Sequence, residues 1–146
     1  MRQYVWLAPI LVAFVLIGYF VYKYGVSGRQ AAAEADALVA DLNAHGAEAE
    51  RTAAALADLP IPTTGTEFHY QLNQISDART AIRIRASELR DRAEQVLPRA
   101  PKDERQRVSE ALSRYVERLV AANDVLQRRT DELQTKIDKL LTPPKA

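Results

Sequence analysis

The chain contains no cysteine, and among its 146 residues it has only two histidines, one methionine, one tryptophan and five glycines. Without cysteine there is neither a disulfide framework nor a reactive thiol to consider. The two histidines, His45 and His69, fall far apart on the expected helices, and no HExxH or Glu-xx-His pattern accompanies them. We therefore expect no zinc or di-iron site, and no cofactor.

Sequence motifs of catalysis are missing as well. No glycine-rich phosphate loop is present, and none of the serines lies in a nucleophile-elbow motif. The carboxylates are scattered along helical patterns, so no acid and base pair stands out. With 20 Lys and Arg against 19 Asp and Glu, the formal net charge is +1, which gives no reason to expect a nucleic-acid partner. The sequence favours a protein that is not an enzyme.

One long apolar run is present: residues 4–22, YVWLAPILVAFVLIGYFVY, carry no charged side chain. A helix needs about 20 apolar residues to cross the hydrocarbon core of a bilayer. Aromatic side chains mark both ends of the run, as is typical of membrane interfaces: Tyr4 and Trp6 at one end, and Tyr19, Phe20, Tyr22 and Tyr24 at the other. The sequence predicts a single-pass transmembrane anchor over residues 1–24, followed by a short linker over 25–30.

A cleaved secretory signal is the alternative interpretation of this run. Such signals have an apolar region of about 7–15 residues and small residues before the cut. Here the run is longer, and the bulky Tyr22, Lys23 and Tyr24 come before the small residues at 25–28, which favours a retained anchor. Flanking basic residues nearly balance, with Arg2 before the run and Lys23 and Arg29 after it. Because most of the chain follows the run, we expect a cytoplasmic amino terminus and an extracytoplasmic folded domain.

The rest of the chain has the pattern of one all-α domain. Apolar residues recur at three- and four-residue steps, typical of helices that pack like a coiled coil. Prolines separate three such segments, so helices are expected over about 29–59, 65–97 and 101–141, with a tail at 142–146. Thr64 and Glu67 have the spacing of a capping box at the start of the second helix. A strand over residues 81–86, AIRIRA, is the local alternative.

The expected core stripes follow from this spacing. They are, helix by helix, Ala35, Leu38, Leu42, His45, Ala49, Thr52, Leu56 and Leu59; Phe68, Leu72, Ile75, Arg79, Ile82, Ala86, Leu89, Ala93 and Val96; and Val108, Leu112, Tyr115, Leu119, Ala122, Leu126, Arg129, Leu133 and Leu140. Short loops make successive helices antiparallel neighbours. We therefore expect an up-down-up three-helix bundle over residues 31–141 that stands on the anchor.

The first candidate site is the turn between the second and third helices. Its basic residues are Arg99, Lys102, Arg105 and Arg107, against Asp103 and Glu104. In an up-down-up bundle this turn returns to the membrane end, where each basic group contributes about 1 kcal/mol of attraction to an anionic leaflet. Contact with lipid headgroups or with an acidic partner is the functional interpretation. An ordinary solvated turn is the alternative.

The second candidate site is a polar layer in the core. Folding the chain about the first loop sets His45 and Arg79 at similar heights, with Asp77 or Glu48 as a possible carboxylate partner. Histidine titrates near neutral pH, so this layer would be pH-sensitive or would bind a ligand. The alternative has Arg79 reaching out to solvent and His45 at the rim. The same folding sets Glu34 and Asp36 level with Arg90 and Arg92.

The third candidate site is the end of the last helix. This helix is the longest, so residues 134–146 should project past the first loop and offer Ile137, Leu140 and Leu141 as exposed anchors for a partner. A frayed end that binds nothing is the alternative.

These features favour a single-pass, membrane-anchored helical subunit, structural or for protein–protein interaction, in a larger membrane or envelope assembly. Its expected partners are membrane lipid and one or more proteins. The alternative is an extracytoplasmic helical sensor that binds a small ligand and acts through a partner. The run lacks a small-xxx-small motif around Gly18, so the oligomeric state stays open.

Overall fold

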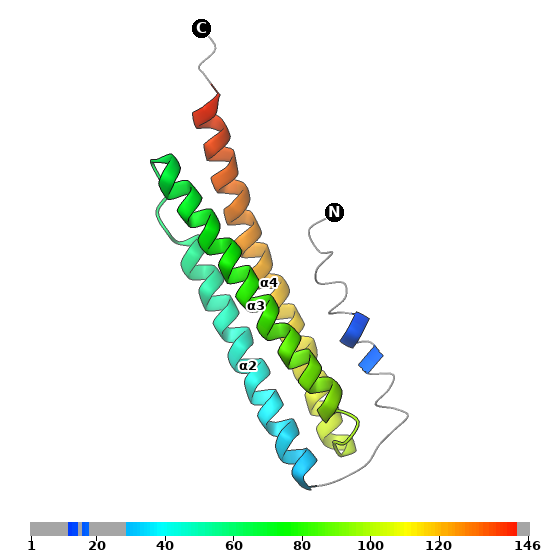
Figure 1. Ribbon diagram of the computed structural model, residues 1–146. Coiled ribbons are helices and arrows are strands. Elements are labelled where there is room, and N and C mark those ends of the chain that lie inside the picture. Colours follow the sequence, from blue (N-terminus) through cyan, green and yellow to red (C-terminus); the bar gives the residue numbers. More distant parts are fainter. Residues whose placement is uncertain (1–11, 15, 18–28, 143–146) are drawn as a thin grey trace.

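The computed structural model describes residues 12–14, 16–17 and 29–142, and it shows a bundle of long helices (Figure 1). The helices are α2 (Arg29–Ala57), α3 (Gly65–Val96) and α4 (Lys102–Leu141). They lie side by side and alternate in direction, so the prediction of an all-helical bundle is confirmed. Within the described ranges there is no strand, and residues 81–86 form part of α3.

None of the helices in the described ranges is both long and apolar enough to cross a bilayer. Most of the predicted anchor over residues 1–24, the linker up to residue 28 and the tail from residue 143 lie outside those ranges. Within the apolar run, residues 12–14, 16 and 17 are described, and they are helical.

Local chemistry explains where α3 begins. The Thr64 hydroxyl accepts a hydrogen bond from the Glu67 amide at 3.3 Å. In return, the Glu67 carboxylate accepts from the amides of Thr63 and Thr64 at 3.1 and 3.3 Å. The predicted capping box is therefore confirmed. These backbone hydrogen bonds hold the pKa of Glu67 below its usual value, and the bond from Thr63 has the larger effect.

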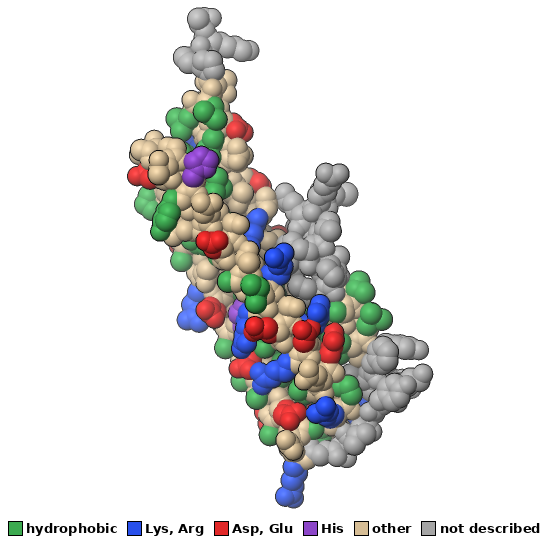
Figure 2. Space-filling model, in the orientation of Figure 1, with side chains coloured by type: hydrophobic (Ala, Val, Ile, Leu, Met, Phe, Trp, Pro, Cys, Tyr) green, Lys and Arg blue, Asp and Glu red, His purple; other side chains and the backbone are tan. Residues whose placement is uncertain are grey.

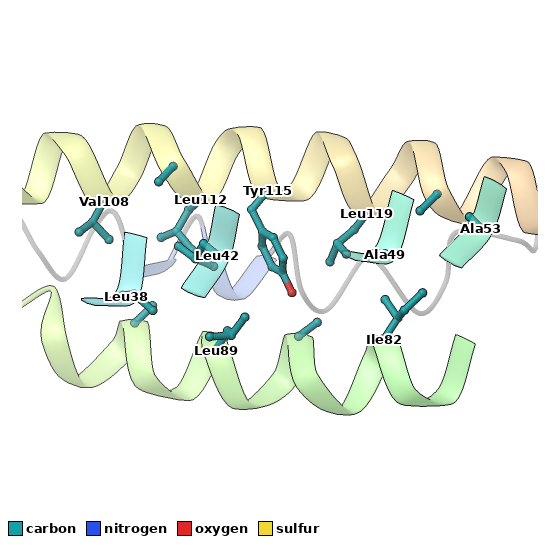
Figure 3. Packing of buried hydrophobic residues seen from close by; sticks show 14 of the residues in the cluster. Leu38, Leu42, Ala49, Ala53, Ile82, Leu89, Val108, Leu112, Tyr115 and Leu119 are labelled. Atoms are coloured by element: carbon teal, nitrogen blue, oxygen red, sulfur yellow. The ribbon is translucent and has the colours of Figure 1, made fainter. Parts of the chain in front are cut away.

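The core runs along the axis of the bundle and is built mainly from Leu and Ala (Figure 3). Helix α2 presents small residues there, Ala35, Ala49 and Ala53, together with Gly46. Small side chains let two helix backbones approach closely, and α2 accordingly makes its most extensive contact with α4. Leu112 and Leu119 of α4 and Leu89 of α3 fill the remaining space between the helices.

Most of the expected core positions are buried, but the stripe of α2 drifts. After Ala49 the buried position is Ala53, whereas Thr52 and Leu56 are only partly buried. An α-helix has 3.6 residues per turn, so a strict seven-residue spacing rotates out of the interface unless the helices supercoil. On α4 the expected stripe ends at Leu133, and Leu140 is exposed.

The register between α2 and α3 differs from the expected one. Arg92 pairs with Asp41, not with Glu34 or Asp36, and Asp36 pairs instead with Arg107 of α4. The cause is the loop over residues 58–64, which continues past the end of α2 before α3 begins, so that α3 starts beyond α2 (Figure 1). A symmetric fold about the loop, which the sequence analysis assumed, misses this offset.

Candidate functional site

The two ends of the bundle differ in chemistry and hold two of the three candidate sites. The base is the end where α2 begins and where α3 turns into α4 (Figure 1). The distal end holds the loop over residues 58–64, the first turns of α3 and the last turns of α4. Between them, the face shown in Figure 2 carries interspersed acidic and basic side chains.

At the base, only part of the basic turn is exposed. Arg107 contacts Asp36 of α2 at 2.8 Å and Glu104 at 2.9 Å. The Nε of the partly buried Arg105 donates to the carbonyl oxygen of Ala100 at 2.6 Å. Arg107 therefore ties the turn to α2, and Arg105 braces the turn's own backbone. The exposed basic side chains of the predicted surface are Arg99, Lys102 and the ion-paired Arg107.

In the core, His45 meets a tyrosine instead of an arginine. His45 Nδ1 lies 2.7 Å from the hydroxyl of Tyr115, and both side chains are buried. Burial raises the pKa of Tyr115, so its hydroxyl stays protonated at neutral pH and shares one hydrogen bond with Nδ1 of the imidazole. Figure 3 shows the Tyr115 ring reaching from α4 into the core.

Burial also lowers the pKa of His45, because a charged imidazole loses its hydration there. The nearby charges partly cancel: Glu48 on α2 and Glu88 on α3 favour the charged ring, whereas Arg85 on α3 opposes it. The structure thus contains a buried neutral histidine that is hydrogen-bonded to a buried phenol.

The structure does not bring Arg79 to this site. Arg79 Nη2 donates to Gln127 Oε1 of α4 at 2.8 Å, and its Nε is buried without a hydrogen-bond partner. Gln127 follows Tyr115 by more than three turns on the same helix, roughly 18 Å at 1.5 Å per residue. The predicted layer of His45 and Arg79 is therefore two separate places, because of the register offset described above.

A second buried polar group, Arg129, organises the distal loop. Its Nη2 donates to the carbonyl oxygen of Leu59 at 2.6 Å and to Gln71 Oε1 at 3.1 Å. Its Nη1 contacts Glu132 at 2.7 Å, and its side chain is only 4% exposed. Gln71 in turn donates to the carbonyl oxygen of Pro60 at 2.8 Å. The apolar spacing puts Arg129 on the core stripe. An arginine at such a position, level with a loop that contains prolines, was the sequence signal for this role.

The distal end carries most of the exposed large apolar side chains of the bundle. Leu140 and Leu141 are 65% and 76% exposed, Ile61 is 42% exposed and Tyr70 is 63% exposed. The expected projection begins later than residue 134, because Leu133 is fully buried and Ile137 packs partly buried against the core. Helix α3 extends past α2, so it covers α4 further than expected (Figure 1).

Across the described ranges, no group of three or more Asp, Glu or His side chains has the arrangement of a metal site. Comparison of the chain with protein-family models, with curated proteins and with solved structures gives no match. The geometry of the bundle itself therefore carries the functional argument.

Proposed function

We propose that this chain is a single-pass, membrane-anchored helical subunit that binds a protein partner in a larger membrane or envelope assembly, and that it has no catalytic role. The uncharged run over residues 4–22 supplies the anchor. The bundle supplies a rigid post, and its folded domain lies outside the cytoplasm.

The observation that carries this proposal is the position of the exposed apolar side chains. Leu140, Leu141, Ile61 and Tyr70 all lie on elements at the end of the bundle opposite the start of α2. Exposed large apolar side chains in one region of a surface are typical of protein contact sites. The distal end is therefore where a partner docks, at the height above the membrane that the length of the bundle sets.

The loop at this end supports the proposal because its backbone is held in place. Arg129 and Gln71 bind its carbonyl oxygens, and Glu67 binds the amides of Thr63 and Thr64. Ile61 is exposed between two prolines whose rings fix their backbone angles. An apolar side chain on a backbone that is already ordered loses little entropy on binding.

The base of the bundle fits the lipid surface. Arg99 and Lys102 are exposed at the end where the apolar run joins the bundle. Both side chains suit anionic headgroups, which attract basic groups by about 1 kcal/mol each. The basic side chains at the base and the docking site at the distal end together define how the subunit is oriented relative to the membrane.

The test is site-specific photo-crosslinking of the full-length chain in its native cells. A photoreactive residue replaces Leu141, and a matched control places the same residue at the exposed Ala81 in the middle of α3. We expect one protein, in fixed stoichiometry, to crosslink through position 141 and not through position 81, and to remain bound after purification in mild detergent. Equal labelling at both positions, or a clean monomer, would refute the docking role.

The alternative function is an extracytoplasmic helical sensor, and the predicted layer of His45 and Arg79 was its candidate ligand site. The structure pairs His45 with Tyr115 in a packed core and places Arg79 elsewhere on the bundle.

A further inference from the structure

Two side chains of the apolar run pack against the base of the bundle. Ile17 is only 7% exposed and belongs to the same hydrophobic cluster as Leu97 and Leu112. Phe14, one helical turn before it, is partly buried against that cluster. The run that is predicted to enter a bilayer therefore also has a contact surface on its own domain.

This surface is a pocket formed by the end of α3 and the first half of α4. From the bundle, Leu97, Arg105, Gln106, Ser109 and Leu112 line it, and Phe14 and Ile17 complete its wall. We call it the basal pocket. Positions 105, 109 and 112 follow one another at three- and four-residue steps, so they form a single stripe along α4, and Leu112 and Leu97 supply the pocket's apolar contact with Ile17.

The pocket covers only part of the run. Val12 and Leu16 are 57% and 52% exposed, although Ile17 beside them is buried. In water, apolar side chains gain from any surface that removes them from solvent. A bilayer removes all faces of an apolar helix from water, so it is the better solvent for the run whenever it is present.

We propose that the basal pocket is a docking site for the chain's own apolar amino-terminal run, and that the pocket and a lipid bilayer compete for that run. In the absence of lipid the run docks and masks part of its apolar surface. On reaching a membrane it leaves the pocket and inserts. This inference rests on the proposed anchor role, which it extends to the state before insertion.

Engineered disulfides test the docked state directly, because the chain has no native cysteine. The test variant is Ile17→Cys with Ser109→Cys, whose two positions line the pocket. The control is Ile17→Cys with Ser76→Cys, an exposed position in the distal half of α3. Full-length chain is made at low concentration by cell-free synthesis, without lipid or with phosphatidylcholine liposomes, and then oxidised. Circular dichroism checks that both variants are equally helical.

Without lipid, we expect the 17–109 pair to form an intramolecular disulfide about tenfold faster than the 17–76 pair, because docking raises the effective concentration of the two thiols. With liposomes present during synthesis, this advantage should disappear. Emission from Trp6, the one tryptophan, should also differ between the lipid-free and the lipid samples.

Three results would overturn the inference. Equal rates for the two pairs without lipid would exclude docking. Disulfide-linked dimers would show that a second copy occupies the pocket. A 17–109 rate that liposomes leave unchanged would exclude competition. Flotation of the liposome samples reports separately on the proposed anchor: chain that fails to float refutes membrane insertion. Chain that floats, together with equal disulfide rates for the two pairs without lipid, refutes only the docking.

Discussion

At the scale of single residues, the buried polar side chains determine which residues face each other across the core, which the apolar pattern alone does not. His45 and Arg129 both occupy core positions and both are hydrogen-bonded: His45 Nδ1 to the hydroxyl of Tyr115, and Arg129 Nη2 to the loop, whereas Nε of Arg129 has no partner. Burying a polar group without a partner costs about 1–3 kcal/mol, so such pairs fix which residues face each other. They specify the arrangement more than they add to stability.

The His45–Tyr115 pair predicts a stability that depends on pH. The folded protein holds the pKa of His45 below its unfolded value of 6.5, so the unfolded chain binds the proton more readily. This contribution is fully present above pH 6.5 and is lost as the pH falls through the folded value. Urea unfolding of the full chain in detergent micelles should therefore show a decline in stability from pH 7 to pH 5.

Substitution at each histidine isolates the source of this decline. His45→Gln should lose about 1 kcal/mol at pH 8, the value of one buried hydrogen bond, and should flatten the pH dependence. His69→Gln is the matched control, because His69 is exposed near the start of α3, and it should keep the wild-type profile. The same decline in both variants would show that His45 is not responsible.

Arg129 gives a second prediction at this scale. Arg129→Met leaves the carbonyl of Leu59 and the side chain of Gln71 without their charged donor. We expect a loss of about 2–3 kcal/mol in the free energy of unfolding, typical for hydrogen bonds to a charged group. Its exposed neighbour Arg128 bonds only within its own helix, so Arg128→Met should stay within about 0.5 kcal/mol of wild type. Equal effects in a urea titration would contradict the loop-holding role.

At the scale of elements, the contact between α2 and α4 depends on small residues. Gly46 has no unusual backbone angle, but a Cβ there would lie 3.0 Å from Cδ of Arg118 and 3.5 Å from the Tyr115 ring. Its hydrogen side chain therefore serves the close approach of the two helices. Next to it, Arg118 donates to the carbonyl oxygen of Asn43 across the same interface at 3.3 Å.

Enlarging this position should separate the two helices. Gly46→Leu gains about 1 kcal/mol in helix propensity and loses about 3 kcal/mol to over-packing, a net loss of roughly 2 kcal/mol. Gly65→Leu is the control, since nothing lies within 4 Å of a Cβ at that position. Thermal unfolding followed by circular dichroism compares the two. A Gly46→Leu variant that unfolds no earlier than Gly65→Leu would contradict close packing at Gly46.

The elements were more predictable than their register. Local rules identify α3, because the capping box at Thr64 and Glu67 and the stripe from Phe68 to Val96 depend on nearby residues alone. The axial register of α3 against α2 depends on how far the loop extends beyond the end of α2. Arg129, which lies on a third helix and far away in the sequence, holds that loop in place. The positions of Arg79 and Ile137 were misjudged for this reason. Leu141 is exposed, and so is Leu140, which the spacing had also placed on the core stripe.

The salt bridges between the helices also show that the register was harder to predict than the elements. Acidic residues of α2, Asp36, Asp41 and Glu50, pair with arginines of α3 and α4. The complementary charge was visible in the sequence, but the individual partners were not. All three pairs are substantially exposed, so each contributes about 0–1 kcal/mol and helps to choose the register.

At the scale of the whole molecule, the proposed subunit has two ends with different tasks. The base joins the apolar run and exposes Arg99 and Lys102, and the distal end exposes Leu140, Leu141 and Ile61. A bundle of antiparallel helices keeps these ends apart at a fixed distance. The proposal therefore depends first on the base being held at a membrane.

Alkaline carbonate extraction of membranes from cells that make the full-length chain tests this central claim most directly. An inserted helix stays with the membrane pellet, so the account predicts that the chain remains there. A variant with Val12→Arg and Leu16→Arg should be released, because each arginine near the middle of a span costs about 2.5–3.5 kcal/mol on insertion. Release of the wild-type chain into the supernatant would contradict the anchor and, with it, the proposed function.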